Sequence, residues 1–241
     1  MVDGPLRWTE QLGPAVLAGT GRPGGVSSGP YDSLNLGGHV GDEPDAVTRN
    51  RERVARAAGV EHLVVAEQVH GRGVVEVVGP WPDDAPEADA LFTRAPGLAL
   101  AVLVADCTPV VVAAPDEGMV GVAHAGRRGM ALGVATSLVE RMRAAGAGRL
   151  VARVGPSICA RCYEVPLAMR EQVAEVEPVA RSVTRTGTPS LDVSAGVLEQ
   201  LARAEVEVAE VPGCTAESDA LFSYRRSRTT GRFAGLAWLR G

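Results

Sequence analysis

The sequence has no excess of basic charge, no long apolar run and no cysteine-rich pattern. Its 24 Lys and Arg residues are outnumbered by 29 Asp and Glu residues, and no basic stripe with interleaved aromatic residues is present. This balance argues against a nucleic-acid-binding protein. The longest apolar run, 98–105, ends at Asp106 and is far shorter than the ~20 residues of a membrane-spanning helix. The first residues contain no cationic region followed by an apolar one. We therefore expect a cytoplasmic protein that acts on a small molecule, away from membranes.

Cysteine is scarce and does not form a disulfide pattern. The four residues are Cys107, Cys159, Cys162 and Cys214. A chain of 241 residues that is 46% apolar can bury a core of its own, so we expect reduced thiols. No internal repeat or low-complexity linker divides the chain, which predicts a single domain over residues 1–241. Nothing in the sequence indicates an oligomeric state.

Turn residues and apolar periodicity predict a mixture of helices and strands. Residues 19–42 are rich in Gly, Ser and Asn, which indicates an ordered loop, and Asp42 is expected to cap a helix over 43–59. Further helices are predicted over 129–145 and near 166–177 and 194–204, and strands over 149–154 and 232–239.

Three further runs share one pattern. The runs HLVVAEQV, GLALAVLVA and MVGVA are each too short for a helix and rich in Val, Leu or Ala, so each predicts a buried strand. The first ends at His70, the second at Asp106 and Cys107, and the third at His124. Potential ligands thus stand at the carboxyl ends of three predicted strands.

Two imidazoles and one thiolate are a usable ligand set for zinc. Three protein ligands leave a fourth position for water or substrate, which is typical of a catalytic site. Each residue taken alone also fits a place in the core, and it is their shared position at strand ends that favours His70, Cys107 and His124 as one site.

The pair Cys159 and Cys162 forms a C-x-x-C motif that competes with this site. A zinc ribbon needs a second such pair, which the sequence lacks, and a redox motif would open a helix directly after a strand. We therefore expect structural roles for this pair and for Cys214.

Seven ordered blocks resemble one family, long labelled polyphenol oxidase or laccase-domain proteins. The blocks are SLNLGGHVGDEPDAVTRNRERV, EQVHG, ADALFT, VADCTPVVV, AHAGRRG, VGPSICARCYEV and GRFAGLAWL, within residues 19–239. The resemblance implies metal ligands in the QVHG, ADC and HAG segments, which here are His70, Cys107 and His124. It also implies an α+β fold with two central sheet layers flanked by helices (α/β/β/α), similar to that of certain toxin deamidases and suggestive of a cysteine-hydrolase ancestry.

The resemblance also implies an activity. Members of the family are assigned zinc-dependent phosphorolysis of adenosine, inosine, guanosine and methylthioadenosine, with adenosine deamination as a second activity. The partners expected are therefore a purine nucleoside and phosphate. Candidate phosphate-binding residues are Arg22, Arg128 and Arg127, the last standing where the family usually has Trp, and Asn35 and His39 are candidates for lining the pocket.

Three alternatives stay open at this stage. Some bacterial members are described as peptidoglycan-editing factors, which would suit an amidase with Cys107 as a nucleophile activated by His70 or His124. A non-catalytic partner for another protein is the second alternative. A multicopper laccase is excluded, because only His39 and His62 remain for further copper ions, but Cu²⁺ at the single site and a phenol oxidase activity there are the third. Asp106 is expected to act as a base or to orient a ligand His.

Overall fold

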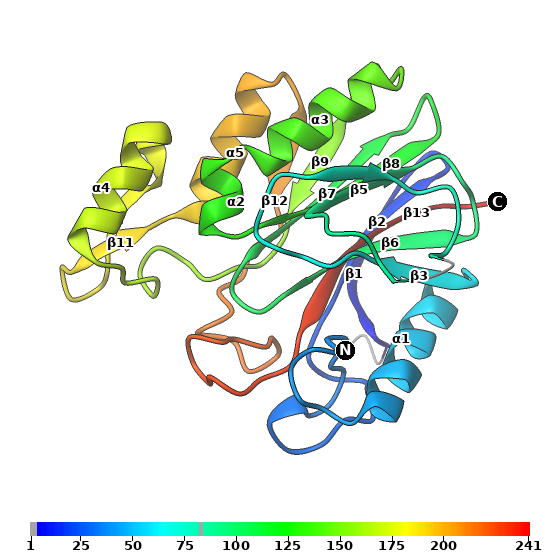
Figure 1. Ribbon diagram of the computed structural model, residues 1–241, viewed down its shortest axis with the longest axis horizontal. Helices are drawn as coiled ribbons and strands as arrows, with labels where there is room; N and C mark the ends of the chain where they lie inside the picture. The colour runs from blue at the N-terminus through cyan, green and yellow to red at the C-terminus, as the bar shows by residue number, and fades with distance from the viewer. Residues whose placement is uncertain (1–3, 82–83) are drawn as a thin grey trace.

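The computed structural model describes residues 4–81 and 84–241, and within them two large β-sheets pack face to face with helices on both outer sides (Figure 1). The helices are α1 (Pro44–Ala58), α2 (Arg127–Ala131), α3 (Val134–Ala144), α4 (Leu167–Val176) and α5 (Val193–Arg203), with short 3₁₀ turns at Gly29–Tyr31 and Pro178–Ala180. The strands are β1 (Leu6–Leu12), β2 (Ala15–Thr20), β3 (His62–Val65), β4 (Val74–Glu76), β5 (Ala90–Thr93), β6 (Leu98–Val104), β7 (Thr108–Ala114), β8 (Met119–Ala125), β9 (Val151–Val154), β10 (Arg181–Val183), β11 (Pro189–Leu191), β12 (Glu207–Glu210) and β13 (Phe233–Leu239).

The two large sheets contain five and six strands, and each combines parallel and antiparallel neighbours. One has the order β1-β2-β13-β6-β3 and the other the order β12-β9-β7-β8-β5-β4, while β10 and β11 form a small separate hairpin. Most neighbours are antiparallel, and the parallel pairs are β3 with β6, β4 with β5 and β9 with β12. The chain passes from one large sheet to the other between β3 and β4, between β5 and β6, between β6 and β7, and again between β12 and β13.

The central strands are apolar along their whole length because both of their faces are covered. In β7, Val110 and Val112 face the helices, whereas Val111 and Ala113 belong to the core between the sheets. Such two-sided burial explains why these segments read as continuous apolar runs instead of alternating ones. The predicted α/β/β/α arrangement is confirmed.

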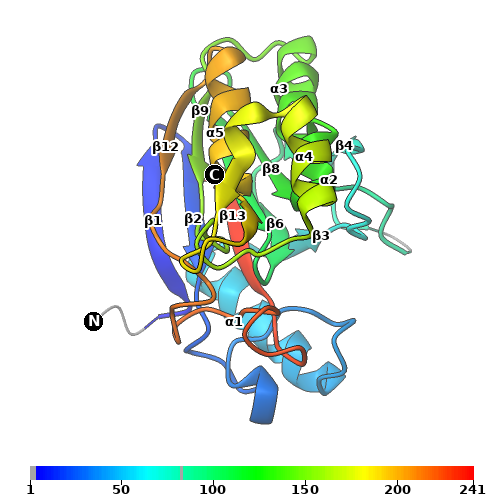
Figure 2. The same ribbon diagram turned by 90° about the vertical axis from the view of Figure 1, so that its left-hand side faces the viewer.

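The helices form two outer layers of unequal size. Helices α2, α3 and α5 lie on the six-stranded sheet, where Leu138 and Met142 of α3 are fully buried, and α4 packs against the β10–β11 hairpin. Helix α1 covers the other sheet through Val54 (Figures 1 and 2). Helix α1 ends at Gly59, whose φ of 70° places it in the left-handed region that glycine adopts without strain. In the part of the chain that the structure describes, no helix combines the length and apolar composition that crossing a membrane would require.

Several local predictions need correction. The helix predicted over 129–145 is two helices, α2 and α3, separated at Gly133, where φ is 77°. Helix α1 begins after Glu43, and Asp42 does not cap its first turn but instead accepts a bond from the side chain of Asn35. Strand β3 stops at Val65, so residues 66–69 lie outside it. His124 lies inside β8, which continues to Ala125, and not beyond its end.

Candidate metal centre and active site

Two connections and the end of one strand bring His70, Cys107 and His124 together at one end of the two sheets. His70 lies on the passage from β3 to β4, Cys107 on the tight passage from β6 to β7, and His124 near the end of β8 beside β7. Their donor atoms all lie within 4.8 Å of one another, and Cys107 Sγ is 3.8 Å from His70 Nε2. The two imidazole rings meet edge to face with centroids 4.7 Å apart. Two imidazole nitrogens and a thiolate suit zinc or copper, so the donor set fits a metal ion.

A buried carboxylate, Asp89, fixes two of these three residues. One of its oxygens bonds His124 Nδ1 at 2.8 Å and accepts the backbone N–H of His70 at 3.0 Å. The other accepts the backbone N–H groups of Val69 at 3.2 Å and Gly71 at 2.6 Å. The Asp89 side chain has no exposed surface, so these four bonds hold the His70 turn against the His124 ring.

The backbone around the site is under local strain. His70 has a φ of 58° and Asp106 a φ of 96°, in a region that costs a non-glycine residue about 1–3 kcal/mol. Asp106 is held there by bonds from Thr215 Oγ1 at 2.6 Å and from the backbone N–H of Arg225 at 2.6 Å. The turn that carries Cys107 is therefore fixed by groups from the last third of the chain.

Gly126 leaves the space that the three side chains occupy. A Cβ atom at this position would lie 2.8 Å from Cδ2 of His70 and 3.0 Å from Sγ of Cys107. The backbone of Gly126 itself, with φ of −72° and ψ of 171°, is open to any residue. The need for glycine here is consequently one of side-chain space at the site.

The electrostatics favour a thiolate beside a charged imidazole when no metal is bound. Burial alone would raise the pKa of Cys107, but the His124 imidazolium and hydrogen bonds from both imidazoles lower it to about 6. Burial would lower the pKa of His124, whereas Cys107 and Asp89 raise it to about 9. Burial likewise opposes ionisation of Asp89, but its bonds from His124 and Gly71 lower its pKa. The site thus stabilises a deprotonated sulfur, the form that binds metals and attacks electrophiles.

Two adjoining cavities open on either side of Cys107. The first, of about 240 Å³, is bordered by three arginines and by the rings of Tyr163 and Tyr224; its arginines are Arg127, Arg225 and Arg228. The second, of about 260 Å³, contains His70 and His124 together with His39, Arg232 and Tyr224. Cys107 and Tyr224 border both cavities, so two ligands can meet at the sulfur.

The residues predicted from the sequence fall at different distances from this centre. Arg127 and His39 border the cavities. Arg22 donates to the carbonyl of Asp32 and lies over the ring of Phe222, and Arg128 is exposed on the short helix α2.

Asn35 and Asp106 have structural contacts. Asn35 is fully buried and bonds to Gly37, Asp42 and Arg232, which ties the loop before α1 to the start of β13. The Asp106 carboxylate bonds to Thr215 and Arg225, and within the described residues it has no hydrogen bond to His70 or His124; the carboxylate bonded to His124 is Asp89.

Sequence reasoning missed Asp89, Tyr224, Arg225 and Arg232. Asp89 opens the ADALFT block and could have been suspected, because a carboxylate commonly orients a ligand imidazole. Tyr224 and Arg225 lie in a segment without apolar periodicity, and Arg232 opens the strand predicted over 232–239. The sequence carries no signal that any of these three residues returns to Cys107.

Comparison with known sequences places the whole chain among related proteins. Residues 16–240 match the family described as multi-copper polyphenol oxidoreductase laccase. A relative from Streptomyces griseus, named purine nucleoside phosphorylase ORF3, is 54% identical over 94% of this chain and 95% of its own length. The protein named purine nucleoside phosphorylase YfiH from Escherichia coli K12 is 39% identical over 97% of both chains.

Solved structures agree with the fold. Neisseria meningitidis protein NMB0706 superposes with a TM-score of 0.86 at 35% identity, over 98% of this chain and all of that one. YlmD from Geobacillus stearothermophilus gives a TM-score of 0.86 at 34% identity, covering 95% and 93% of the two chains.

Proposed function

The chain belongs to the multi-copper polyphenol oxidoreductase laccase family, and from this premise we propose that it is a zinc-dependent purine nucleoside phosphorylase. The observation that carries the proposal is the convergence of His70, Cys107 and His124 between two cavities. The names of the relatives from Streptomyces griseus and Escherichia coli support the same activity. The substrates are adenosine, inosine, guanosine and methylthioadenosine, and adenosine deamination is a second activity.

His70, Cys107 and His124 would hold the zinc ion. When bound, zinc supplies a Lewis acid that polarises an oxygen or lowers the pKa of bound water. Asp89 keeps the proton of neutral His124 on Nδ1, which leaves the Nε2 lone pair free for a ligand bond. Asp106 acts indirectly on the site, because its bonds to Thr215 and Arg225 fix the turn that carries Cys107.

Phosphorolysis breaks the bond between ribose C1′ and the purine nitrogen and forms a bond from C1′ to a phosphate oxygen, while the purine leaves with a proton. We assign phosphate to the first cavity because Arg127, Arg225 and Arg228 border it and guanidinium groups bind phosphate oxygens in pairs. We assign the nucleoside to the second cavity, where His39 and Tyr224 offer polar and aromatic contacts. Both ligands then meet beside Cys107.

The test is incubation of the purified protein with inosine or adenosine, with and without phosphate. We expect phosphate-dependent release of hypoxanthine or adenine together with ribose 1-phosphate, and separate ammonia release from adenosine. Cys107→Ala and His124→Ala should abolish release, whereas His62→Ala, at an exposed histidine of β3, should retain it. Full phosphorolysis by Cys107→Ala would overturn the proposal.

Two further variants test the assignment of the cavities. Loss of a charge-assisted contact of about 1.5–3 kcal/mol predicts a roughly 10- to 150-fold rise in the KM for phosphate in Arg127→Ala. The KM for inosine should rise instead in His39→Ala. An unchanged KM for phosphate in Arg127→Ala would remove Arg127 from the phosphate site.

A second candidate function is favoured by one observation. The pKa of Cys107, lowered to about 6 beside a histidine that Asp89 orients, matches the nucleophile, base and orienting carboxylate of a cysteine amidase. Such an enzyme would cleave an amide of a peptidoglycan precursor, and zinc on the thiolate would inhibit it. Chelation therefore separates the two functions: it should abolish phosphorolysis but activate an amidase.

The phenol oxidase alternative has weaker support. Copper outcompetes zinc at most nitrogen and sulfur donors and would fit the same three ligands. However, the chain contains only four histidines, and a coupled oxygen-reducing copper cluster needs more than the two that remain. Single-site copper oxidation of a phenol would be detected as oxygen consumption after loading with Cu²⁺.

A further inference from the structure

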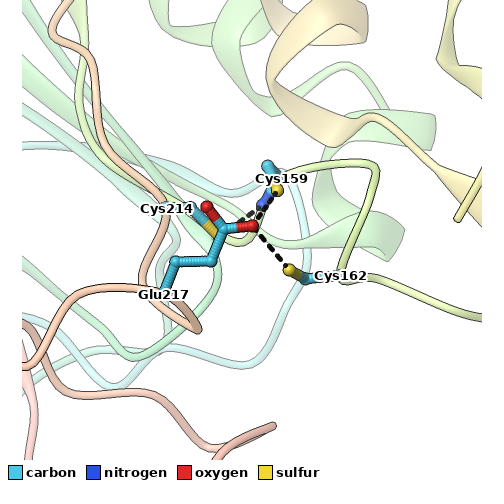
Figure 3. Close-up of side chains that lie close together, drawn as sticks. All are labelled: Cys159, Cys162, Cys214 and Glu217. Atoms are coloured by element: carbon cyan, nitrogen blue, oxygen red, sulfur yellow. Dashed lines mark hydrogen bonds between the residues drawn. The ribbon is translucent and has the colours of Figure 1, made fainter. Parts of the chain in front are cut away.

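A second group of metal-binding side chains lies outside the active site. Its members come from two loops distant in the sequence and are named here the cysteine–glutamate cluster: Cys159, Cys162, Cys214 and Glu217 (Figure 3). Their four donor atoms lie within 4.8 Å of one another, and all three cysteines are free thiols. Figure 3 shows the sulfur atoms gathered around the carboxylate of Glu217.

The cluster is built from two turns of the same form. The backbone N–H of Cys162 donates to the carbonyl of Cys159 at 2.9 Å, and that of Glu217 donates to the carbonyl of Cys214 at 3.2 Å. The second turn, C-T-A-E, is thus the counterpart that the C-x-x-C motif lacks in the sequence, with a carboxylate in place of the fourth thiol. The expectation of a merely structural role for the pair rested on the absence of such a counterpart.

The turns are positioned by contacts that need no metal. Ser157 and Cys214 form an isolated parallel bridge, in which Thr215 N–H donates to the Ser157 carbonyl at 3.0 Å. The backbone N–H of Cys159 points to Cys214 Sγ at 3.4 Å. The cluster therefore rests on a backbone frame that presents its four side chains to one point.

The separations of the donors suit a tetrahedral ion. Bonds of about 2.3 Å to sulfur and about 2.1 Å to oxygen imply a sulfur-to-oxygen separation of about 3.6 Å around tetrahedral zinc. Glu217 Oε1 lies 3.7 Å from Cys159 Sγ and 3.1 Å from Cys162 Sγ. Both separations lie within about 0.5 Å of that value.

The charges point to a soft or borderline cation. Thiols form only weak hydrogen bonds, so packing three of them against a carboxylate gains little unless an ion lies between them. Mg²⁺ and Ca²⁺ prefer oxygen ligands, whereas thiolates select zinc. Arg161 and Arg185 pair with Glu217 from outside and would offset the negative charge of a three-thiolate site.

We propose that the cysteine–glutamate cluster is a second zinc site, structural in role, which fastens the loop after β9 to the loop after β12. Four protein donors leave no position for water or substrate, unlike the three-residue centre at Cys107. Residues 211–232 contain no helix or strand, and so long an irregular segment needs fixing by other contacts.

This fastening bears on the active site. Ile158 and Tyr163, on either side of the C-x-x-C turn, border the first cavity, and Thr215, next to Cys214, bonds Asp106. A zinc ion bound to the cluster would fix the position of one wall of that cavity relative to the turn that carries Cys107. It would act as a positioning element, with no contact to substrate.

Metal counting on the full-length protein tests the proposal. Reduced, metal-free protein is loaded with Zn²⁺, freed of excess and analysed for zinc per chain. We expect two ions in the wild type, one in Cys107→Ser, one in Cys162→Ser and none in the double variant. Glu164→Gln, an exposed carboxylate in the same loop, is the matched control and should keep both.

Cobalt provides a readout independent of activity and of the three-residue centre. Cys107→Ser retains every member of the cluster, so Co²⁺ titration should end at one ion with near-ultraviolet absorption from three thiolates. This holds even if the proposed phosphorylase function fails or Cys162→Ser does not fold. A folded Cys107→Ser protein that takes up no metal would overturn the second site. A count of two free thiols instead of four in the denatured, chelator-treated wild type would also overturn it, because it would reveal a disulfide.

Discussion

Replacement of Asp89 by Asn tests the network on which the proposed metal centre depends. The carboxylate accepts four bonds, two at each oxygen, and all four donors are N–H groups if His124 is neutral with its proton on Nδ1. An amide can accept at only one of its two ends. If the amide nitrogen takes the position that faces Val69 and Gly71, the backbone N–H groups of these two residues meet another donor and lose their buried acceptor.

The opposite orientation of the amide also disrupts the site. The amide nitrogen would then donate to Nδ1 of His124, so the imidazole proton would move to Nε2. That nitrogen would no longer have a lone pair for a metal ion. Loss of two bonds to a buried charge predicts a destabilisation of about 3–5 kcal/mol. Loss of the partner of a ligand imidazole predicts a roughly 10- to 100-fold weaker zinc affinity.

Zinc affinity is measured by competition with a chromophoric chelator, and stability by urea denaturation followed by circular dichroism. Asp106→Asn is the matched control, because that carboxylate bonds Thr215 and Arg225 and, within the described part of the chain, has no hydrogen bond to either ligand histidine. Its zinc affinity should fall less than that of Asp89→Asn. Wild-type affinity in Asp89→Asn, or a larger loss in Asp106→Asn, would refute the role given to Asp89.

Two further predictions follow from the same geometry. Gly126→Ala should fold but lose zinc affinity and phosphorolysis, because its Cβ would lie 2.8 Å from Cδ2 of His70. The control Gly79→Ala, whose Cβ would meet no atom within 4 Å, should keep both properties. A fully active Gly126→Ala variant would contradict this reasoning. The Cys107 pKa of about 6 predicts that, in metal-free protein, alkylation of this thiol by iodoacetamide reaches half its maximal rate near pH 6, because the thiolate forms as pH rises through that value. Bound zinc should suppress the alkylation. Peptide mass spectrometry measures the rate, and a midpoint near the ~8.5 of an ordinary thiol would show that His124 does not stabilise the sulfur.

The layers of the fold follow from the sequence because the strongest local signals survive in the structure. Strand β13 and helices α4 and α5 lie within a few residues of their predicted positions. Strand β7, whose TPVVVAA run directly follows Cys107, is absent from the predicted elements, because Thr108 and Pro109 indicate a turn at the point where the strand begins. Strand β1 alternates between half-buried and exposed residues, and its Trp, Glu and Gln give it no apolar run.

The three ligand residues could be picked from the sequence because each stands at or near the end of an apolar run. The partners of these residues could not, because they depend on which strands lie side by side. Asp89 and His124 are 35 positions apart, and only the pairing of β5 with β8 joins them, with His124 N–H donating to the Asp89 carbonyl at 2.7 Å. The same limit hid the second half of the cysteine–glutamate cluster.

The register of β8 ties the proposed chemistry to the stability of the fold. Val120 and Val122 of this strand pack into the core between the sheets, whereas Ala123 and Ala125 face the helices. Because side chains alternate along a strand, His124 lies on the same face as the two valines, at the open end of the inter-sheet core. A slip of one residue would turn His124 toward the helices and bring the valines out of that core, so the packing that stabilises the sheets also selects the orientation of the ligand.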